Sequence, residues 1–196
     1  MIRRPTLLFG LSLALALGAA VLVWRDGSTE PGHNVGESAA IGGPFTLTDQ
    51  DGKVQSDRNF RGRWMLVYFG YTYCPDTCPT TLQEIADAFR KLGPKGRDAV
   101  PIFVTLDPAR DRPAILRKYL AAFGPEFVGL TGTPAQIASV AHAYRVYYTK
   151  HPLPGGGYSI DHASTIYLMA PDGRFASLLD DQQGSGALAK ELGARL

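Results

Sequence analysis

Hydrophobic positions along the chain fall into three patterns. One long apolar segment runs from Thr6 to Trp24. Short, nearly continuous apolar runs, such as 64–70 and 100–106, are typical of strands buried on both faces of a sheet. Between such runs lie segments with apolar residues at helical spacing. The alternation of the two shorter patterns from residue 44 onward predicts one α/β domain, residues 44–196.

The expected elements of this domain follow a single order. A hairpin opens it, with turn residues at 49–52 between two short strands. Strands are expected at 64–70, 100–106, 127–130, 165–169 and 175–179, and helices after residue 76, at 113–123, at 134–144 and from about 186. Residues 150–159 contain three consecutive glycines and are expected to form a long loop. This order predicts a thioredoxin-like fold, in which a crossover helix joins parallel strands and an antiparallel pair completes the sheet.

The N-terminal apolar segment is about as long as needed to cross a hydrocarbon layer of roughly 30 Å, and two arginines precede it. We therefore expect a transmembrane anchor in residues 1–24, with a cleaved signal peptide as the alternative because small residues occupy 18–20. Residues 25–43 have few large apolar side chains and predict a flexible tether. The positive-inside rule then predicts a single-pass protein of the cytoplasmic (inner) membrane with its soluble domain in the periplasm.

Composition narrows the classes of function. With 45% hydrophobic residues, 19% charged residues and a net charge of +2, the chain resembles a globular domain plus an apolar segment, and no basic run supports a nucleic-acid partner. The chain has 2 cysteines, Cys74 and Cys78. In an oxidising compartment such a pair tends to form a disulfide unless it is reduced or bound to metal.

The spacing and surroundings of the cysteines favour chemistry over packing. They are four residues apart, so on a helix both sulfurs would share one face. The helix that follows them begins at Asp76 or Thr77, or at a capping box formed by Thr81 and Glu84. Either start leaves the sulfurs near a helix N-terminus, where the dipole favours the thiolate. A disulfide closing so short a loop would stabilise the fold little, so the pair predicts a redox or metal site.

His162 is the candidate third ligand. It stands between a Gly-rich segment and a buried strand, where the thioredoxin-like topology brings it across from the cysteines. Two thiolates and one imidazole suit Cu(I), a soft ion that accepts low coordination numbers. Zinc would accept the same ligands with a water molecule, and Cu(II) would accept them with a carboxylate or water. The residue types therefore leave the metal open.

Three stretches of the sequence carry a family resemblance. They are Phe-Gly-Tyr-Thr-Tyr-Cys-Pro-Asp-Thr-Cys-Pro at 69–79, Thr-Leu-Asp-Pro-Ala-Arg-Asp at 105–111, and Tyr-Ser-Ile-Asp-His-Ala-Ser-Thr-Ile-Tyr-Leu at 158–168 with Pro-Asp-Gly at 171–173. Together they resemble the signature stretches of the Sco/SenC family, in the same order. The resemblance implies a membrane-anchored, thioredoxin-like copper-binding protein that helps to assemble the CuA centre of cytochrome c oxidase. Its implied partners are subunit II of that oxidase, a copper donor and a thiol reductant.

The resemblance also assigns roles to residues. It implies that Cys74, Cys78 and His162 bind copper, as Cu(I) or Cu(II). Asp107 matches the family's aspartate before proline, whose role lies in redox or metal chemistry, although a turn or capping role explains it as well. Asp161 is expected to be a turn residue or to support His162 without binding the metal.

Rival functions use the same thiols. A thiol–disulfide oxidoreductase or peroxidase on this fold would use Cys74 and Cys78 as a redox-active pair, with Cys74 as the attacking sulfur. Against that reading, thioredoxins more often have a Cys-x-x-Cys pair, and Ala163 and Ser164 offer no proline opposite the thiols. A copper or redox sensor would also use these residues. Nothing in the sequence separates such a sensor from a protein that delivers copper. Together with the resemblance, the residues lead us to expect a metallochaperone that could also reduce the cysteines of its partner.

Overall fold

The computed structural model describes residues 41–180 and 182–196. The expected anchor, 1–24, and the tether up to residue 40 lie outside the described residues, so both stay predictions. None of the helices in the described residues has both the length and the apolar character that a membrane span needs.

The described residues form nine strands and four α-helices. The strands are β1 (Thr46–Asp49), β2 (Val54–Ser56), β3 (Trp64–Gly70), β4 (Ala99–Thr105), β5 (Val128–Thr131), β6 (Tyr148–Pro152), β7 (Tyr158–His162), β8 (Thr165–Met169) and β9 (Phe175–Asp180). The helices are α2 (Thr77–Leu92), α3 (Pro113–Leu120), α4 (Pro134–Ala143) and α5 (Gly184–Gly193), with 3-10 turns η1 (Asp57–Phe60) and η2 (Gly93–Asp98).

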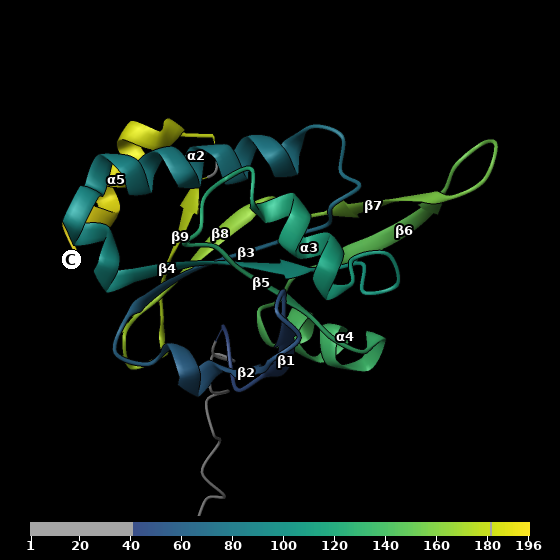
Figure 1. Ribbon diagram of the computed structural model, residues 1–196, viewed down its shortest axis with the longest axis horizontal. Helices are drawn as coiled ribbons and strands as arrows, with labels where there is room; N and C mark the ends of the chain where they lie inside the picture. Colours follow the sequence, from purple (N-terminus) through teal and green to yellow (C-terminus); the bar gives the residue numbers. More distant parts are fainter. Residues whose placement is uncertain (1–40, 181) are drawn as a thin grey trace, which may run out of the picture. The chain divides into compact units, whose positions relative to one another are not determined.

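Seven strands form one sheet in the order β2-β1-β5-β4-β3-β8-β9. Strands β3, β4 and β5 are parallel, and β8 and β9 continue the sheet antiparallel beside β3. The opening hairpin adds β1 and β2 at the far edge, through antiparallel pairing of β1 with β5. The thioredoxin-like α/β fold expected from the sequence is confirmed (Figure 1).

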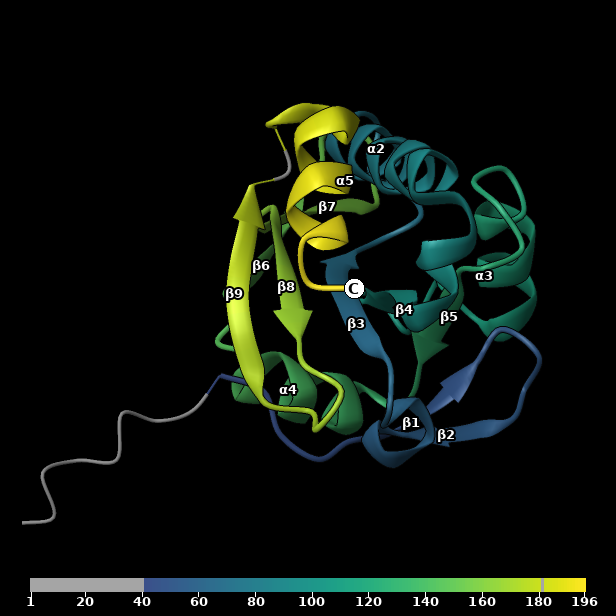
Figure 2. The ribbon, with the colours of Figure 1, turned by 90° about the vertical axis from the view of Figure 1, so that its left-hand side faces the viewer.

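The hydrophobic core has two parts, one on each face of the sheet. Leu66 and Tyr68 of β3 pack into the part covered by α2, α3 and α5, and Met65 and Val67 pack into the part covered by α4. Figure 2 shows α2 and α5 side by side over one face, with α4 across the sheet from them. As the sequence indicated, β3 is apolar throughout because both of its faces are buried.

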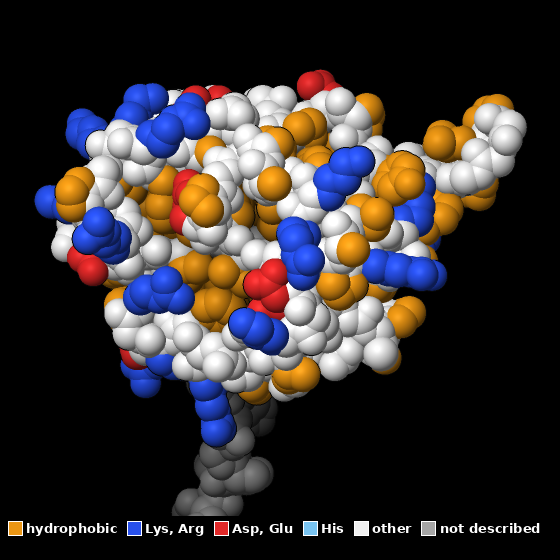
Figure 3. Space-filling view, viewed as in Figure 1, with side chains coloured by type: hydrophobic (Ala, Val, Ile, Leu, Met, Phe, Trp, Pro, Cys, Tyr) orange, Lys and Arg blue, Asp and Glu red, His pale blue; other side chains and the backbone are white. Residues whose placement is uncertain are grey.

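Residues 148–162 correct one expectation. The predicted loop at 150–159 is largely a hairpin, in which β6 pairs antiparallel with β7 as a separate two-stranded sheet. Most side chains of β6 are exposed, so the strand lacks the alternation of apolar and polar residues that would have revealed it. The hairpin projects from the rest of the domain (Figure 1), and Figure 3 shows hydrophobic side chains near its tip. Leu153, which directly follows β6, is one of the exposed hydrophobic residues.

Candidate metal centre

The candidate ligands lie near one another at the end of the large sheet where strands β3 and β4 finish. Strand β3 ends at Gly70 and the parallel strand β4 ends at Thr105 beside it. Strand β8 is antiparallel to β3, so its first residue, Thr165, lies at the same edge. The loop with the cysteines, the loop after β4 and His162 are therefore close together, as expected where parallel strands end.

Cys78 lies in the first turn of α2, and Cys74 lies in the loop before it. The helix begins at Thr77, so the start at Asp76 or Thr77 is confirmed and the capping box at Thr81 is wrong. The two sulfurs do not share a helix face, because Cys74 precedes the helix. Instead the N–H group of Cys78 donates to Cys74 Sγ at 3.4 Å, which satisfies one of the unpaired donors of the helix N-terminus. No disulfide joins the two residues.

The Cys78 side chain is completely buried, whereas Cys74 is half-buried. Cys78 Sγ fits against Gly70, where an added Cβ would lie only 2.8 Å from the sulfur. Burial raises the pKa of the Cys78 thiol to about 12, although the Tyr71 N–H group counteracts part of this shift. The expectation of a helix-stabilised thiolate is wrong for Cys78, because burial desolvates the sulfur and so raises the pKa of its thiol.

His162 ends β7 and faces Cys78. Its Nε2 atom lies 3.5 Å from Cys78 Sγ, and its Nδ1 atom lies 3.0 Å from the carbonyl oxygen of Ala163. A carbonyl oxygen only accepts hydrogen bonds, so Nδ1 carries the proton and Nε2 directs its lone pair toward the sulfur. The rings of Tyr68 and Tyr71 pack edge-on against the imidazole, with centroid distances of 6.3 and 6.1 Å.

The donor set suits a soft metal ion. In residues 41–180 and 182–196, no three His, Cys, Asp or Glu side chains are already close enough together to hold a metal ion. Cys78 is close to both of the other candidate ligands: its N–H group contacts Cys74 Sγ, and its Sγ lies 3.5 Å from His162 Nε2. Cys74 or the hairpin would have to move for all three side chains to contact one ion. Two sulfurs and one imidazole nitrogen fit Cu(I) without further ligands.

Asp107 faces positive charge and lies beside the hairpin. Its side chain is completely buried, forms an ion pair with Arg110, and accepts a hydrogen bond from the Tyr158 hydroxyl at 2.7 Å. Lys150 Nζ lies 3.6 Å from the same carboxylate. The main-chain carbonyl oxygen of Asp107 accepts hydrogen bonds from the N–H groups of Arg110 and Asp111, and these bonds form the expected turn. A direct role in metal or redox chemistry stays a prediction.

Asp161 points away from the site. Its side chain is 75% exposed and pairs with His151 Nε2 at 3.1 Å, on the opposite face of β7 from the buried Ile160. Its expected supporting role for His162 stays a prediction, and the pairing with His151 links the two strands of the hairpin.

Sequence reasoning missed Asp111, which lies inside one of the three signature stretches. Its buried carboxylate accepts hydrogen bonds from the Thr72 N–H group at 2.9 Å and from the Thr105 hydroxyl at 2.6 Å. Burial raises the pKa of Asp111, and the hydrogen bonds from the two threonines oppose that rise. The contacts fasten the loop with the cysteines to the end of β4.

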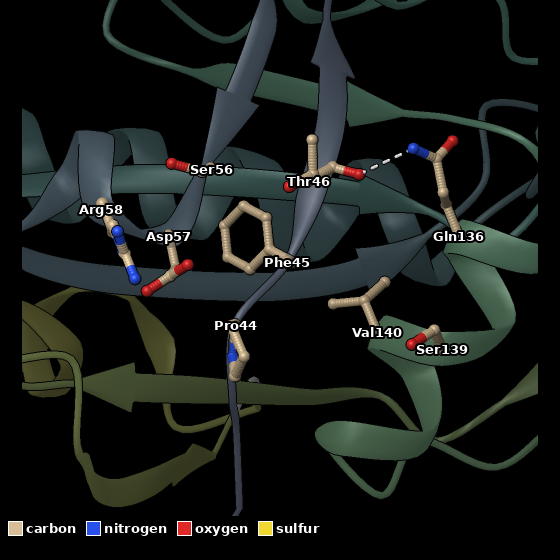
Figure 4. Close-up of a pocket in the computed structure, with 9 residues that line it drawn as sticks. All are labelled: Pro44, Phe45, Thr46, Ser56, Asp57, Arg58, Gln136, Ser139 and Val140. Carbon is tan, nitrogen blue, oxygen red and sulfur yellow. Dashed lines mark hydrogen bonds between the residues drawn. The ribbon is translucent and has the colours of Figure 1, made fainter.

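A separate cavity of about 460 Å³ lies between the opening hairpin and α4 (Figure 4). It is lined by Pro44, Phe45, Thr46, Ser56, Asp57, Arg58, Gln136, Ser139 and Val140. Gln136 Nε2 donates to the main-chain oxygen of Thr46 at 3.0 Å. The lining contains neither a thiol nor an imidazole, so it offers no ligand for a soft metal.

Known proteins of other organisms are similar to this chain in sequence. A protein SCO1 homolog 1, mitochondrial, of Arabidopsis thaliana is 45% identical over 138 residues, which are 70% of this chain and 41% of that protein. A protein SCO2 homolog, mitochondrial, of Bos taurus is 39% identical over 180 residues, which are 88% of this chain and 68% of that protein. This chain thus matches less than half of the Arabidopsis relative.

Among solved structures, that of Bradyrhizobium japonicum ScoI with copper bound has a TM-score of 0.76 and 46% identity, covering 80% of this chain and 100% of that one. The family model described as SCO1/SenC matches residues 34–196, a range that includes all three candidate ligands. The chain therefore belongs to the SCO1/SenC family.

Proposed function

We propose that this protein binds one copper ion through Cys74, Cys78 and His162 and delivers it during assembly of the CuA centre of cytochrome c oxidase. The observation that carries this proposal is the pairing of a buried thiol with an imidazole, Cys78 Sγ to His162 Nε2 at 3.5 Å, beside a second thiol. Membership of the SCO1/SenC family and the copper-bound structure of a relative support it.

The proposal includes the partners and the location of the protein. Copper arrives from a donor protein while a thiol reductant keeps Cys74 and Cys78 reduced, since an oxidised pair has no thiolates to offer. Subunit II of the oxidase receives the copper by stepwise exchange of ligands. Residues 1–24 hold the protein in the cytoplasmic membrane, with the copper site on the periplasmic side.

A second role as a thiol reductase is favoured by the unequal burial of the two sulfurs. Cys74 is half-buried and can reach a partner's disulfide, while Cys78 is completely buried behind it. In such a reaction the Cys74 thiolate attacks the partner disulfide, and Cys78 then displaces the partner's sulfur to close a disulfide in this protein. Copper binding and disulfide formation compete for the same sulfurs, so the two roles exclude each other at any one moment.

The test is an anaerobic titration of the reduced full chain with Cu(I), in competition with a chromophoric chelator. We expect one tightly bound ion, lost in Cys78→Ser and weakened about tenfold or more in His162→Ala, equivalent to about 1.4 kcal/mol or more of binding free energy. His142→Ala, which alters an exposed histidine on α4, is the matched control and should bind as the wild type does. Equal Cu(I) affinity in all four proteins would contradict the proposed copper site.

A further inference from the structure

Arg110 lies where three segments of the site meet. Its Nε atom donates to the buried carboxylate of Asp107, and its Nη1 atom donates to the main-chain oxygen of Tyr158 at 3.1 Å. Asp107 is on the loop after β4, whereas Tyr158 is the first residue of β7. One guanidinium group thus connects the loop after β4 to the hairpin that carries His162.

Aromatic rings enclose the same guanidinium group. Its central carbon lies 3.8 Å from the centroid of the Tyr158 ring and 4.6 Å from that of Tyr73, distances at which a cation and a ring attract each other. Tyr73 directly precedes Cys74. Lys150 of β6 adds a second cation, 4.4 Å from the centroid of the Tyr158 ring. We call Tyr73, Asp107, Arg110, Lys150 and Tyr158 the Arg110 clasp.

The hairpin depends on contacts at its base. Strands β6 and β7 form a separate sheet, and an isolated two-stranded hairpin is at best marginally stable in water. The hairpin also projects from the domain (Figure 1), and in Figure 3 basic and hydrophobic side chains lie next to one another where it begins. Besides the clasp, its base is held by the buried Ile160, whose N–H group donates to the Tyr71 hydroxyl at 3.3 Å.

Contacts at Tyr158 also limit the position of His162, because both residues lie on β7. Side chains two and four residues apart in a strand point to the same side, so Tyr158, Ile160 and His162 share one face of β7. Ile160 is buried, while Asp161 on the other face is exposed. The clasp therefore holds the start of the strand on the face from which the imidazole reaches Cys78.

We propose that Arg110 is a positioning residue: through Asp107 and Tyr158 it fixes β7 so that His162 Nε2 lies beside Cys78 Sγ. The effect on copper rests on the proposed function, because it acts through His162. Without Arg110, the half-exposed Lys150 is the one cationic neighbour that the completely buried Asp107 keeps among residues 41–180 and 182–196. A buried carboxylate is costly without a close partner, and lysine cannot reproduce the two-pronged, stacked contact of arginine.

The first arm of the test needs no metal. Hydrogen exchange of the reduced full chain is compared in the wild type, in Arg110→Gln and in Arg117→Gln. Arg117→Gln is the matched control, because Arg117 of α3 forms an exposed ion pair with Asp51, which lies outside the hairpin of β6 and β7. We expect amides of 148–162 to exchange about tenfold faster or more in Arg110→Gln, with the core strands unchanged, and no change in the control. Unchanged exchange in the hairpin of Arg110→Gln would overturn the inference.

The second arm is a double-mutant cycle on Cu(I) affinity. Arg110→Gln should weaken binding about tenfold in the wild-type background and have no effect in His162→Ala, because its action passes through the histidine. Arg110→Lys should be intermediate. Equal weakening in both backgrounds would refute a positioning role.

The two arms separate the two proposals. If the wild type fails to bind Cu(I), the proposed function fails and the exchange measurement alone decides whether the clasp holds the hairpin. If Arg110→Gln does not fold, Tyr158→Phe takes its place, because it keeps the ring and removes only the hydrogen bond to Asp107. It should accelerate exchange in the hairpin in the same direction by a smaller factor, and no acceleration would count against the clasp.

Discussion

Replacement of Gly70 by alanine tests how firmly the Cys78 sulfur is seated. Gly70 ends β3, and an added Cβ would lie 2.8 Å from Cys78 Sγ and 2.9 Å from Cε2 of Phe103. Non-bonded contacts are comfortable at about 3.5–4.0 Å, so the sulfur, the Phe103 ring or the strand must move by roughly 1 Å. Each of these groups is completely or almost completely buried, so none can move into solvent.

The cost follows from overpacking a filled core. Such substitutions destabilise by about 1–3 kcal/mol. For a domain of roughly 150 residues, each 1 kcal/mol lowers the melting temperature by about 2–4 °C, so Gly70→Ala should melt about 2–12 °C below the wild type. Cys78 Sγ lies 3.5 Å from His162 Nε2, and its displacement should weaken Cu(I) binding as well.

Thermal unfolding of the reduced, metal-free protein and competitive Cu(I) titration measure the two effects. Gly186→Ala is the control, because its Cβ would meet no atom within 4 Å and it lies inside α5. Alanine in a helix stabilises by about 0.5–1 kcal/mol relative to glycine, so this variant should melt at or slightly above the wild type. If Gly70→Ala melts within about 1 °C of the wild type, the overpacking estimate is wrong. If it also keeps full Cu(I) affinity, the sulfur is not held as described.

Two further predictions concern ionisable groups of the site. Burial raises the pKa of Asp111 in the folded state, so its contribution to stability is complete below the usual value of 3.8 and declines as the pH rises through the folded-state pKa. Urea unfolding measures the free energy of unfolding of the wild type and of Asp111→Asn as a function of pH. As the pH rises through this window, the wild type should lose stability relative to Asp111→Asn, and the difference should become constant at higher pH. A difference that does not depend on pH would contradict the raised pKa. For the thiols, a pKa of about 12 leaves Cys78 with roughly one thiolate in 10⁴ at pH 8. Iodoacetamide should therefore label Cys74 first in the reduced protein, as read by peptide mass spectrometry, and equal labelling rates would refute the buried setting of Cys78.

The elements that could be predicted from the sequence are those whose side chains are buried in a regular pattern. Strands β3 and β4 are apolar throughout because both of their faces are covered, and α2 shows buried residues at helical spacing from Cys78 to Phe89. The ligand candidates came from residue chemistry, since thiols and an imidazole are informative wherever they stand.

The features that escaped prediction depend on contacts between distant residues. Arg110 and Tyr158 are 48 positions apart, and nothing in either local segment indicates that they meet. The exposed strand β6 gives no periodic signal, so a hairpin rich in proline and glycine resembled a loop. The pKa of Cys78 was misjudged for a related reason: the sequence placed it at a helix N-terminus but did not show that its sulfur lies under Gly70, in the core.

The unequal burial of the two cysteines bears on how a metal could be released. Cys78 and His162 are held by the core and by the hairpin, whereas Cys74 lies half-buried in the loop before α2. Under the proposed function, a partner's ligand therefore reaches the copper from the side of Cys74 and replaces that sulfur first, while Cys78 and His162 still hold the ion. If hairpin contacts such as the Arg110 clasp then loosen, His162 is free to withdraw, and the buried Cys78 sulfur remains as the last ligand for the partner to displace. Exchange of one ligand at a time keeps the ion coordinated at every step, and the unequal burial of Cys74 and Cys78 gives that exchange an order.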